Sequence, residues 1–134
     1  MYTLNESVIE ENLSVRPAYL QINLSTLTAN YHAIQQAVGE RAVMVILKAN
    51  AYGHGLVRVA QHIAQEGVAY FGVAYLEEAL LLRQHGVQTP ILVLGGIVGN
   101  QIPLFIEHHI TITASSVEKL EAIEAAAQTL GIKA

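Results

Sequence analysis

The chain has 134 residues, enough for one modest domain with a single hydrophobic core. Its net charge of −4 argues against binding to nucleic acid or to an anionic membrane, and the absence of cysteine excludes disulfides, thiolate metal sites and a cysteine nucleophile. Hydrophobic residues make up 52% of the chain, yet no segment approaches the ~20 uninterrupted apolar residues of a membrane span. This composition predicts either elements that are buried on more than one face or a surface that contacts another molecule, and the lack of cysteine fits a cytoplasmic protein.

The beginning of the chain predicts a leader, a strand and a helix. Residues 1–15 are polar and are expected to be a flexible leader, and the folded part is expected to begin at residue 16. Apolar and polar residues alternate over 18–24, which is typical of a half-exposed strand. Ser25 is then expected to cap a helix over 26–38.

The remainder alternates strands with helices. Strands are expected at 43–47, 70–74, 90–94 and 110–113. Helices are expected at 56–65 and 77–85, from residue 100 or 101 to 108, and from a cap at Ser115 or Ser116 to about residue 130. The helical residues expected to face inward include Leu27, Tyr31, Ile34, Val38, Leu56, Val59, Ile63, Leu80, Leu81, Val117, Leu120, Ile123 and Ala127. Four strand–helix units of roughly 20–25 residues favour a parallel sheet. Two architectures fit: an open doubly wound sheet, or the first half of a (β/α)8 barrel, whose complete form takes ~250 residues.

Lys48 is the residue with the clearest chemical meaning. The apolar run Val43-Met-Val-Ile-Leu places it at or just past the carboxyl end of a buried strand, where α/β proteins bind their ligands. A desolvated lysine amine is a Schiff-base nucleophile, and Asn50, Tyr52 and His54 follow in one polar loop. The residues alone therefore predict either a snorkelling strand-end lysine or a lysine that binds pyridoxal phosphate.

Other polar segments favour simpler explanations. The glycine-rich segments at 53–55 and 95–99 complete neither a dinucleotide fingerprint nor a P-loop, which favours tight turns after strands. The histidines lack the spacing of metal ligands, so no metal site is predicted. Glu77 and Glu78 open a helix, where acidic residues suit the helix dipole without any catalytic role.

Several motifs resemble the alanine racemase family. Lys48-Ala-Asn-Ala-Tyr-Gly-His-Gly55 is similar over eight consecutive residues to the pyridoxal-phosphate attachment motif of bacterial alanine racemases. Ala18-Tyr-Leu-Gln-Ile-Asn-Leu-Ser-Thr-Leu resembles the family's opening segment. Phe71-Gly-Val-Ala-Tyr-Leu-Glu-Glu-Ala and Leu82-Arg-Gln-His-Gly-Val-Gln-Thr-Pro-Ile-Leu-Val-Leu-Gly95 resemble its second and third barrel units. The resemblance covers nearly everything from Arg16 onward.

The resemblance implies a TIM-type (β/α)8 barrel that carries pyridoxal 5'-phosphate and precedes a β-rich domain. It implies an isomerase that interconverts L-alanine and D-alanine, supplies D-alanine for peptidoglycan of the cell wall, and acts as a homodimer. Carried over by position, Lys48 would bind the cofactor as an aldimine and then act as one of two bases on Cα. Tyr52 would hydrogen-bond the cofactor phosphate, and Leu94 would pack near the cofactor.

The resemblance also limits the expectation. The family's second base is a tyrosine of the β-rich domain, and its pyridine-facing arginine and later phosphate loop lie beyond the fourth unit. Residues 16–134 are thus expected to be a partial barrel with little or no racemase activity alone, which self-associates through its sheet edges. The alternatives are a non-catalytic pyridoxal-phosphate-binding module and a structural module in which Lys48 has no function.

Overall fold

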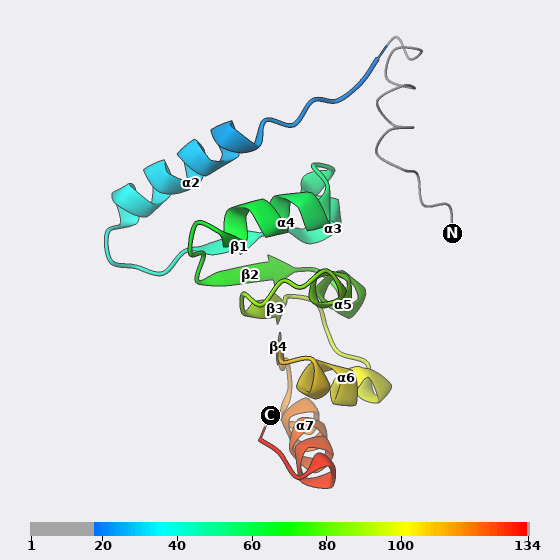
Figure 1. Ribbon diagram of the computed structural model, residues 1–134. Helices are drawn as coiled ribbons and strands as arrows, with labels where there is room; N and C mark the ends of the chain where they lie inside the picture. Colours follow the sequence, from blue (N-terminus) through cyan, green and yellow to red (C-terminus); the bar gives the residue numbers. More distant parts are fainter. Residues whose placement is uncertain (1–17, 134) are drawn as a thin grey trace.

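The computed structural model describes residues 18–133, shown in Figure 1. Its first elements are α2 (Leu24–Val38), β1 (Met44–Ile46), the short turn α3 (Lys48–Tyr52), α4 (Leu56–Ala64) and β2 (Tyr70–Val73). They are followed by α5 (Leu76–Gln84), β3 (Ile91–Val93), the 3-10 turn η1 (Gly99–Gln101), α6 (Ile102–Glu107), β4 (Ile110–Ile112) and α7 (Val117–Leu130). The predicted leader at 1–15 lies outside the described residues, so its flexibility stays a prediction.

The strands form one parallel sheet in the order β1-β2-β3-β4. In Figure 1 they follow one another down the picture in chain order, with α2 beyond β1 and α7 beyond β4. Neighbours in the sheet are therefore neighbours in the chain, as they are in a (β/α)8 barrel. This arrangement confirms the predicted parallel sheet of repeating strand–helix units.

The two faces of the sheet differ in burial. Alternate residues on one face are packed against the helices and almost completely buried: Phe71, Val73, Ile91 and Val93. The opposite face is more open, because Met44 of β1 is 38% exposed and Thr111 of β4 is exposed as well. The hydrophobic core therefore lies between the sheet and its helices, and the open face corresponds to the interior side of a barrel.

The strand expected at 18–24 is absent, and its helix begins earlier than expected. Residues 18–23 have no regular secondary structure, and Leu20 is 75% exposed. A strand needs a neighbour for its backbone hydrogen bonds, and no described strand pairs with this segment. Asn23, not Ser25, caps α2, because its side chain accepts a hydrogen bond from the Thr26 N–H at 2.9 Å.

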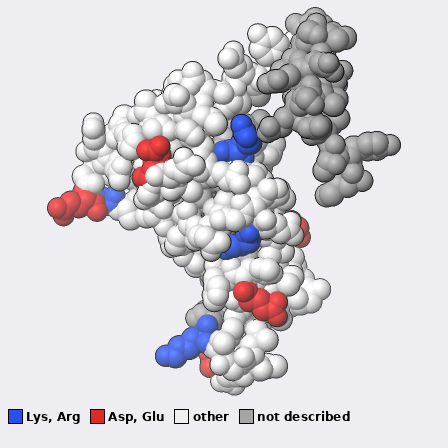
Figure 2. Space-filling view, viewed as in Figure 1, with Lys and Arg blue, Asp and Glu red and all other residues white. Residues whose placement is uncertain are grey.

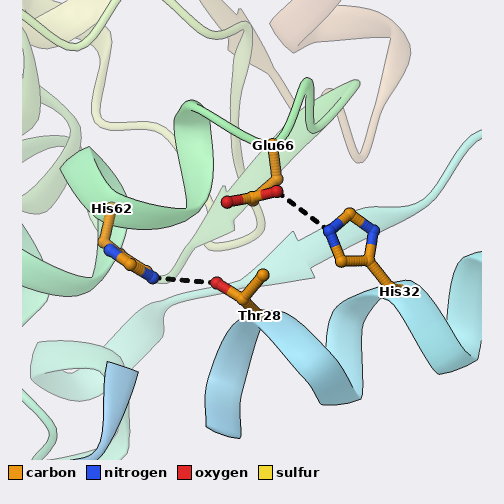
Figure 3. Close-up of polar contacts among 4 residues, drawn as sticks. All are labelled: Thr28, His32, His62 and Glu66. Carbon is orange, nitrogen blue, oxygen red and sulfur yellow. Dashed lines mark hydrogen bonds and ion pairs between the residues drawn. The ribbon is translucent and has the colours of Figure 1, made fainter. Parts of the chain in front are cut away.

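Two polar pairs, visible in Figure 3, hold helix α2 against α4 and the turn that follows it. Thr28 Oγ1 lies 2.8 Å from His62 Nε2, and His32 Nε2 lies 2.9 Å from Glu66 Oε2. Thr28 and His32 are four residues apart and so share one face of the helix. The buried ring of Tyr31 adds the apolar part of this contact.

Some apolar helix positions face outward, contrary to the sequence prediction. Ile34 is 52% exposed, Leu81 39%, Val117 65% and Leu120 55%. Helix α5 instead buries Leu76, Ala79 and Leu82, which share the stripe that meets the sheet. Helix α7 packs mainly against α6 at the end of the sheet, so only its side near Ala127 reaches the core. Within residues 18–133, no helix is both long and apolar enough to cross a bilayer.

Candidate functional site

Lys48 directly follows the buried Leu47 at the carboxyl end of β1. The Leu47 N–H still donates to Gly72 O at 2.7 Å, which continues the sheet pairing one residue past β1. Lys48 itself is exposed and begins the turn α3. The predicted position at the end of the strand is therefore correct, and the side chain is exposed because the chain leaves the sheet at this residue.

The turn that follows Lys48 is left-handed over four consecutive residues without glycine. The φ values are +54° at Ala49, +57° at Asn50, +52° at Ala51 and +53° at Tyr52. This conformation costs about 1–2 kcal/mol per residue because Cβ approaches the following carbonyl oxygen. Such a run persists only where the surrounding structure holds it, and strained backbone of this kind concentrates at functional sites.

The polar side chains of this loop do not converge on one point. Asn50 Oδ1 accepts from the Leu56 N–H at 2.8 Å, and His54 Nδ1 donates to Ala51 O at 2.8 Å. Both side chains therefore stabilise the turn itself. Tyr52 is different, because the residue is 59% exposed and makes none of these bonds within the turn.

Leu94 lies at the same edge of the sheet, just past the end of β3. Its N–H donates to Val73 O at 2.8 Å, and its side chain is 41% exposed. Leu94 Cδ1 would be 3.6 Å from a Cβ atom at Gly72, so it leans over the middle of the open face. Lys48 and Leu94 thus follow strands that flank β2 at its carboxyl end.

Glu78 joins this edge from α5, which the sequence prediction did not anticipate. Its Oε1 accepts from the Asn50 N–H at 3.2 Å, and its Oε2 accepts from the Ala74 N–H at 2.9 Å. One carboxylate therefore bridges the loops after β1 and β2. A glutamate in the first turn of a helix is expected to contact the backbone at the start of that helix, but it gives no sign of the contact with Asn50.

Two further features bear on a binding site: a cleft beside α2, and the placement of the residues that could bind a metal ion. A cleft of about 380 Å³ lies between α2, β1 and the turn, lined by residues that include Thr26, Leu27, Val45 and Tyr52. Of the three predicted cofactor residues, Tyr52 lines this cleft, whereas Lys48 and Leu94 do not. The described residues contain no group of three or more His, Asp or Glu side chains arranged to hold a metal ion.

Comparison with known proteins points to one family. The family model described as "Alanine racemase, N-terminal domain" matches residues 22–134. Among curated relatives, the alanine racemase of Streptococcus uberis is 43% identical over 86% of this chain and 31% of its own length. Alanine racemase 1 of Caldanaerobacter subterraneus is 39% identical over 82% of this chain and 29% of its own length.

Solved structures agree with the sequence relatives. Alanine racemase of Clostridium difficile 630 has a TM-score of 0.80 and 38% identity over 84% of this chain and 30% of that chain. A histidine racemase from Leuconostoc mesenteroides has a TM-score of 0.76 and 34% identity over 82% of this chain and 30% of that chain. The chain thus spans about a third of the length of these relatives. The order and orientation of its strands, its turn after β1 and these matches together show that the chain belongs to the alanine racemase family, with the fold of part of that family's (β/α)8 barrel.

Proposed function

We propose that this chain supplies the cofactor-binding lysine of a pyridoxal-phosphate-dependent amino-acid racemase that interconverts L-alanine and D-alanine. The observation that carries the proposal is the placement of Lys48: an exposed amine at the carboxyl end of β1, on a constrained left-handed turn. Lysine offers the only side-chain amine that can form a Schiff base, and ligands of parallel α/β folds bind at this edge.

The residues at this edge fit pyridoxal 5'-phosphate in their chemistry. The cofactor has an aldehyde, an anionic phosphate and a planar ring, which need an amine, hydrogen-bond donors and an apolar contact. Lys48 offers the amine, the exposed Tyr52 hydroxyl can donate to a phosphate oxygen, and the partly exposed Leu94 offers the apolar contact. When bound, the cofactor supplies the electron sink that makes the Cα proton of an amino acid removable.

Lys48 would serve twice in this reaction. Its amine would hold the cofactor and, when free, would accept or donate the proton at one face of Cα. Tyr52 and Leu94 would hold the cofactor in place so that the amine stays within reach of Cα. Racemisation also needs a second acid or base at the opposite face, which a longer protein would supply.

The substrate and the assembly rest on the relatives. The relatives named alanine racemase favour alanine as the substrate. A similar barrel segment is also found in a protein named histidine racemase, so the segment by itself does not fix the amino acid. We propose alanine as substrate, D-alanine for peptidoglycan as the product's use, a cytoplasmic location, and a homodimer for the longer protein. The 134-residue chain alone should bind the cofactor without racemising alanine.

Covalent trapping tests this proposal. The chain is mixed with pyridoxal phosphate, reduced with borohydride, digested, and its labelled peptides are identified by mass spectrometry. Labelling should concentrate on Lys48 and disappear in the Lys48→Arg variant, which keeps the charge but cannot form the Schiff base. Equal labelling of Lys119 and Lys133 would refute a specific site at Lys48. Absence of the visible aldimine absorbance band before reduction would indicate a structural module that binds no cofactor.

A further inference from the structure

The left-handed turn after Lys48 has an unusual partner outside its own segment. Most of its hydrogen bonds are internal, such as the one from the Gly55 N–H to Asn50 O at 3.0 Å. The Asn50 N–H, in contrast, points out of the turn and donates to Glu78 Oε1 at 3.2 Å. Glu78 belongs to the next strand–helix unit, so a neighbouring unit restrains the backbone two residues after Lys48.

Ordinary helix capping explains two of the three hydrogen bonds that Glu78 accepts. As the third residue of α5, it accepts from the N–H groups of Tyr75 at 3.4 Å and Ala74 at 2.9 Å, both through Oε2. These two hydrogen bonds are capping contacts. The hydrogen bond from the Asn50 N–H to Oε1 does not cap α5. It restrains the turn that follows Lys48.

We propose that Glu78 is a positioning residue that holds the left-handed turn and thereby fixes where the Lys48 amine stands. The inference deepens the proposed function and rests on it for the role of Lys48. A carboxylate suits this position because both of its oxygens accept hydrogen bonds. The glutamine amide has one accepting oxygen and one donating NH2 group. Its two ends therefore cannot both accept hydrogen bonds from the N–H groups of the two loops.

The variant Glu78→Gln therefore tests the bridge with almost no change in shape. Glu77→Gln is the matched control, since it removes the same charge from an exposed position in the same helical turn. Backbone amide hydrogen exchange, measured by NMR, reports the turn directly. In Glu78→Gln the Asn50 amide should exchange about tenfold faster, the typical effect of losing a charge-assisted hydrogen bond. Exchange at the buried Ala79 and Leu82 of α5 should stay unchanged, which shows that the helix persists.

The second readout is the lysine itself. Borohydride trapping of pyridoxal phosphate at Lys48 should slow by about tenfold in Glu78→Gln and stay at the original rate in Glu77→Gln. Unchanged Asn50 exchange would overturn the proposal, and so would faster exchange with unchanged trapping. If the original chain takes no label at Lys48, the proposed function fails, and the Asn50 exchange rates then decide for or against the Glu78 bridge on their own.

Discussion

At the residue scale, Gly95 is required by a close approach of two backbones. A Cβ atom at this position would lie 2.4 Å from Ala74 O, far inside van der Waals contact. The same carbonyl accepts from the Gly95 N–H at 3.0 Å, so the chain after β3 lies directly against the chain after β2. Leu94 is therefore positioned at the carboxyl edge of the sheet by its glycine neighbour.

The variant Gly95→Ala should destabilise the fold by roughly 1–3 kcal/mol, because a backbone carbonyl cannot move aside as a side chain can. Gly96→Ala is the control, since its Cβ would meet only the flexible end of Lys119 at 3.4 Å. We expect Gly96→Ala to stay within about 0.5 kcal/mol of the original chain. Urea unfolding followed by circular dichroism measures both, and equal midpoints would contradict the steric argument.

The sequence predicts part of this site and misses the rest for physical reasons. Lys48 is placed correctly because an apolar β-branched run ends directly before it. The left-handed turn is not predictable from Ala49 and Ala51, since alanine strongly prefers right-handed helix. Glu78 is missed because its contact with Asn50 joins residues that are far apart in the chain.

At the scale of elements, Arg83 ties together the loops that precede β3 and β4. Its guanidinium donates to Val87 O at 2.7 Å and Thr89 O at 2.9 Å, and to His108 O at 3.0 Å and His109 O at 3.1 Å. Burial lowers the pKa of Arg83 from its ordinary value, and the nearby Tyr70 acts in the opposite direction. The guanidinium nevertheless stays charged at any pH at which proteins fold.

The variant Arg83→Lys should cost about 2 kcal/mol, because one ammonium group cannot reach carbonyls of two loops. Arg41→Lys is the matched control, since Arg41 is exposed and donates to Val38 O at 3.2 Å. A lowered arginine pKa affects stability only at pH values close to that pKa, so the cost should be equal at pH 6 and pH 8. Thermal unfolding at both pH values measures it, and a cost that vanishes at either pH would contradict this account.

The order of the elements was predictable, whereas their exposed faces were only partly so. Short apolar runs give all four strands to within one residue at each end. The alternation over 18–24 gives a false strand, because period-two alternation records which residues could face a core and not whether a partner strand is present. Val117 and Leu120 face outward since α7 has the sheet's end and α6 as neighbours, and periodicity carries no information on neighbours.

At the scale of the whole molecule, the sheet has two outer edges and one open face. Within residues 18–133, no strand pairs with the outer side of β1 or of β4. On the face seen in Figure 2, charged side chains are few and scattered over a mostly uncharged surface. Unpaired strand edges beside apolar side chains favour pairing with another chain, and little charge opposes it.

We therefore expect the 134-residue chain to self-associate through the sheet, and Met44→Lys to weaken that association. Met44 lies on the edge strand β1 and is 38% exposed, so a lysine there fits without a buried charge and repels a second copy at the edge. Ile34→Lys on α2 is the control, because it makes a similar change at a 52% exposed position away from the sheet. Sedimentation velocity over a range of concentrations should show a lower average mass for Met44→Lys than for Ile34→Lys. A monomer at every concentration, or equal association of both variants, would contradict pairing through this edge.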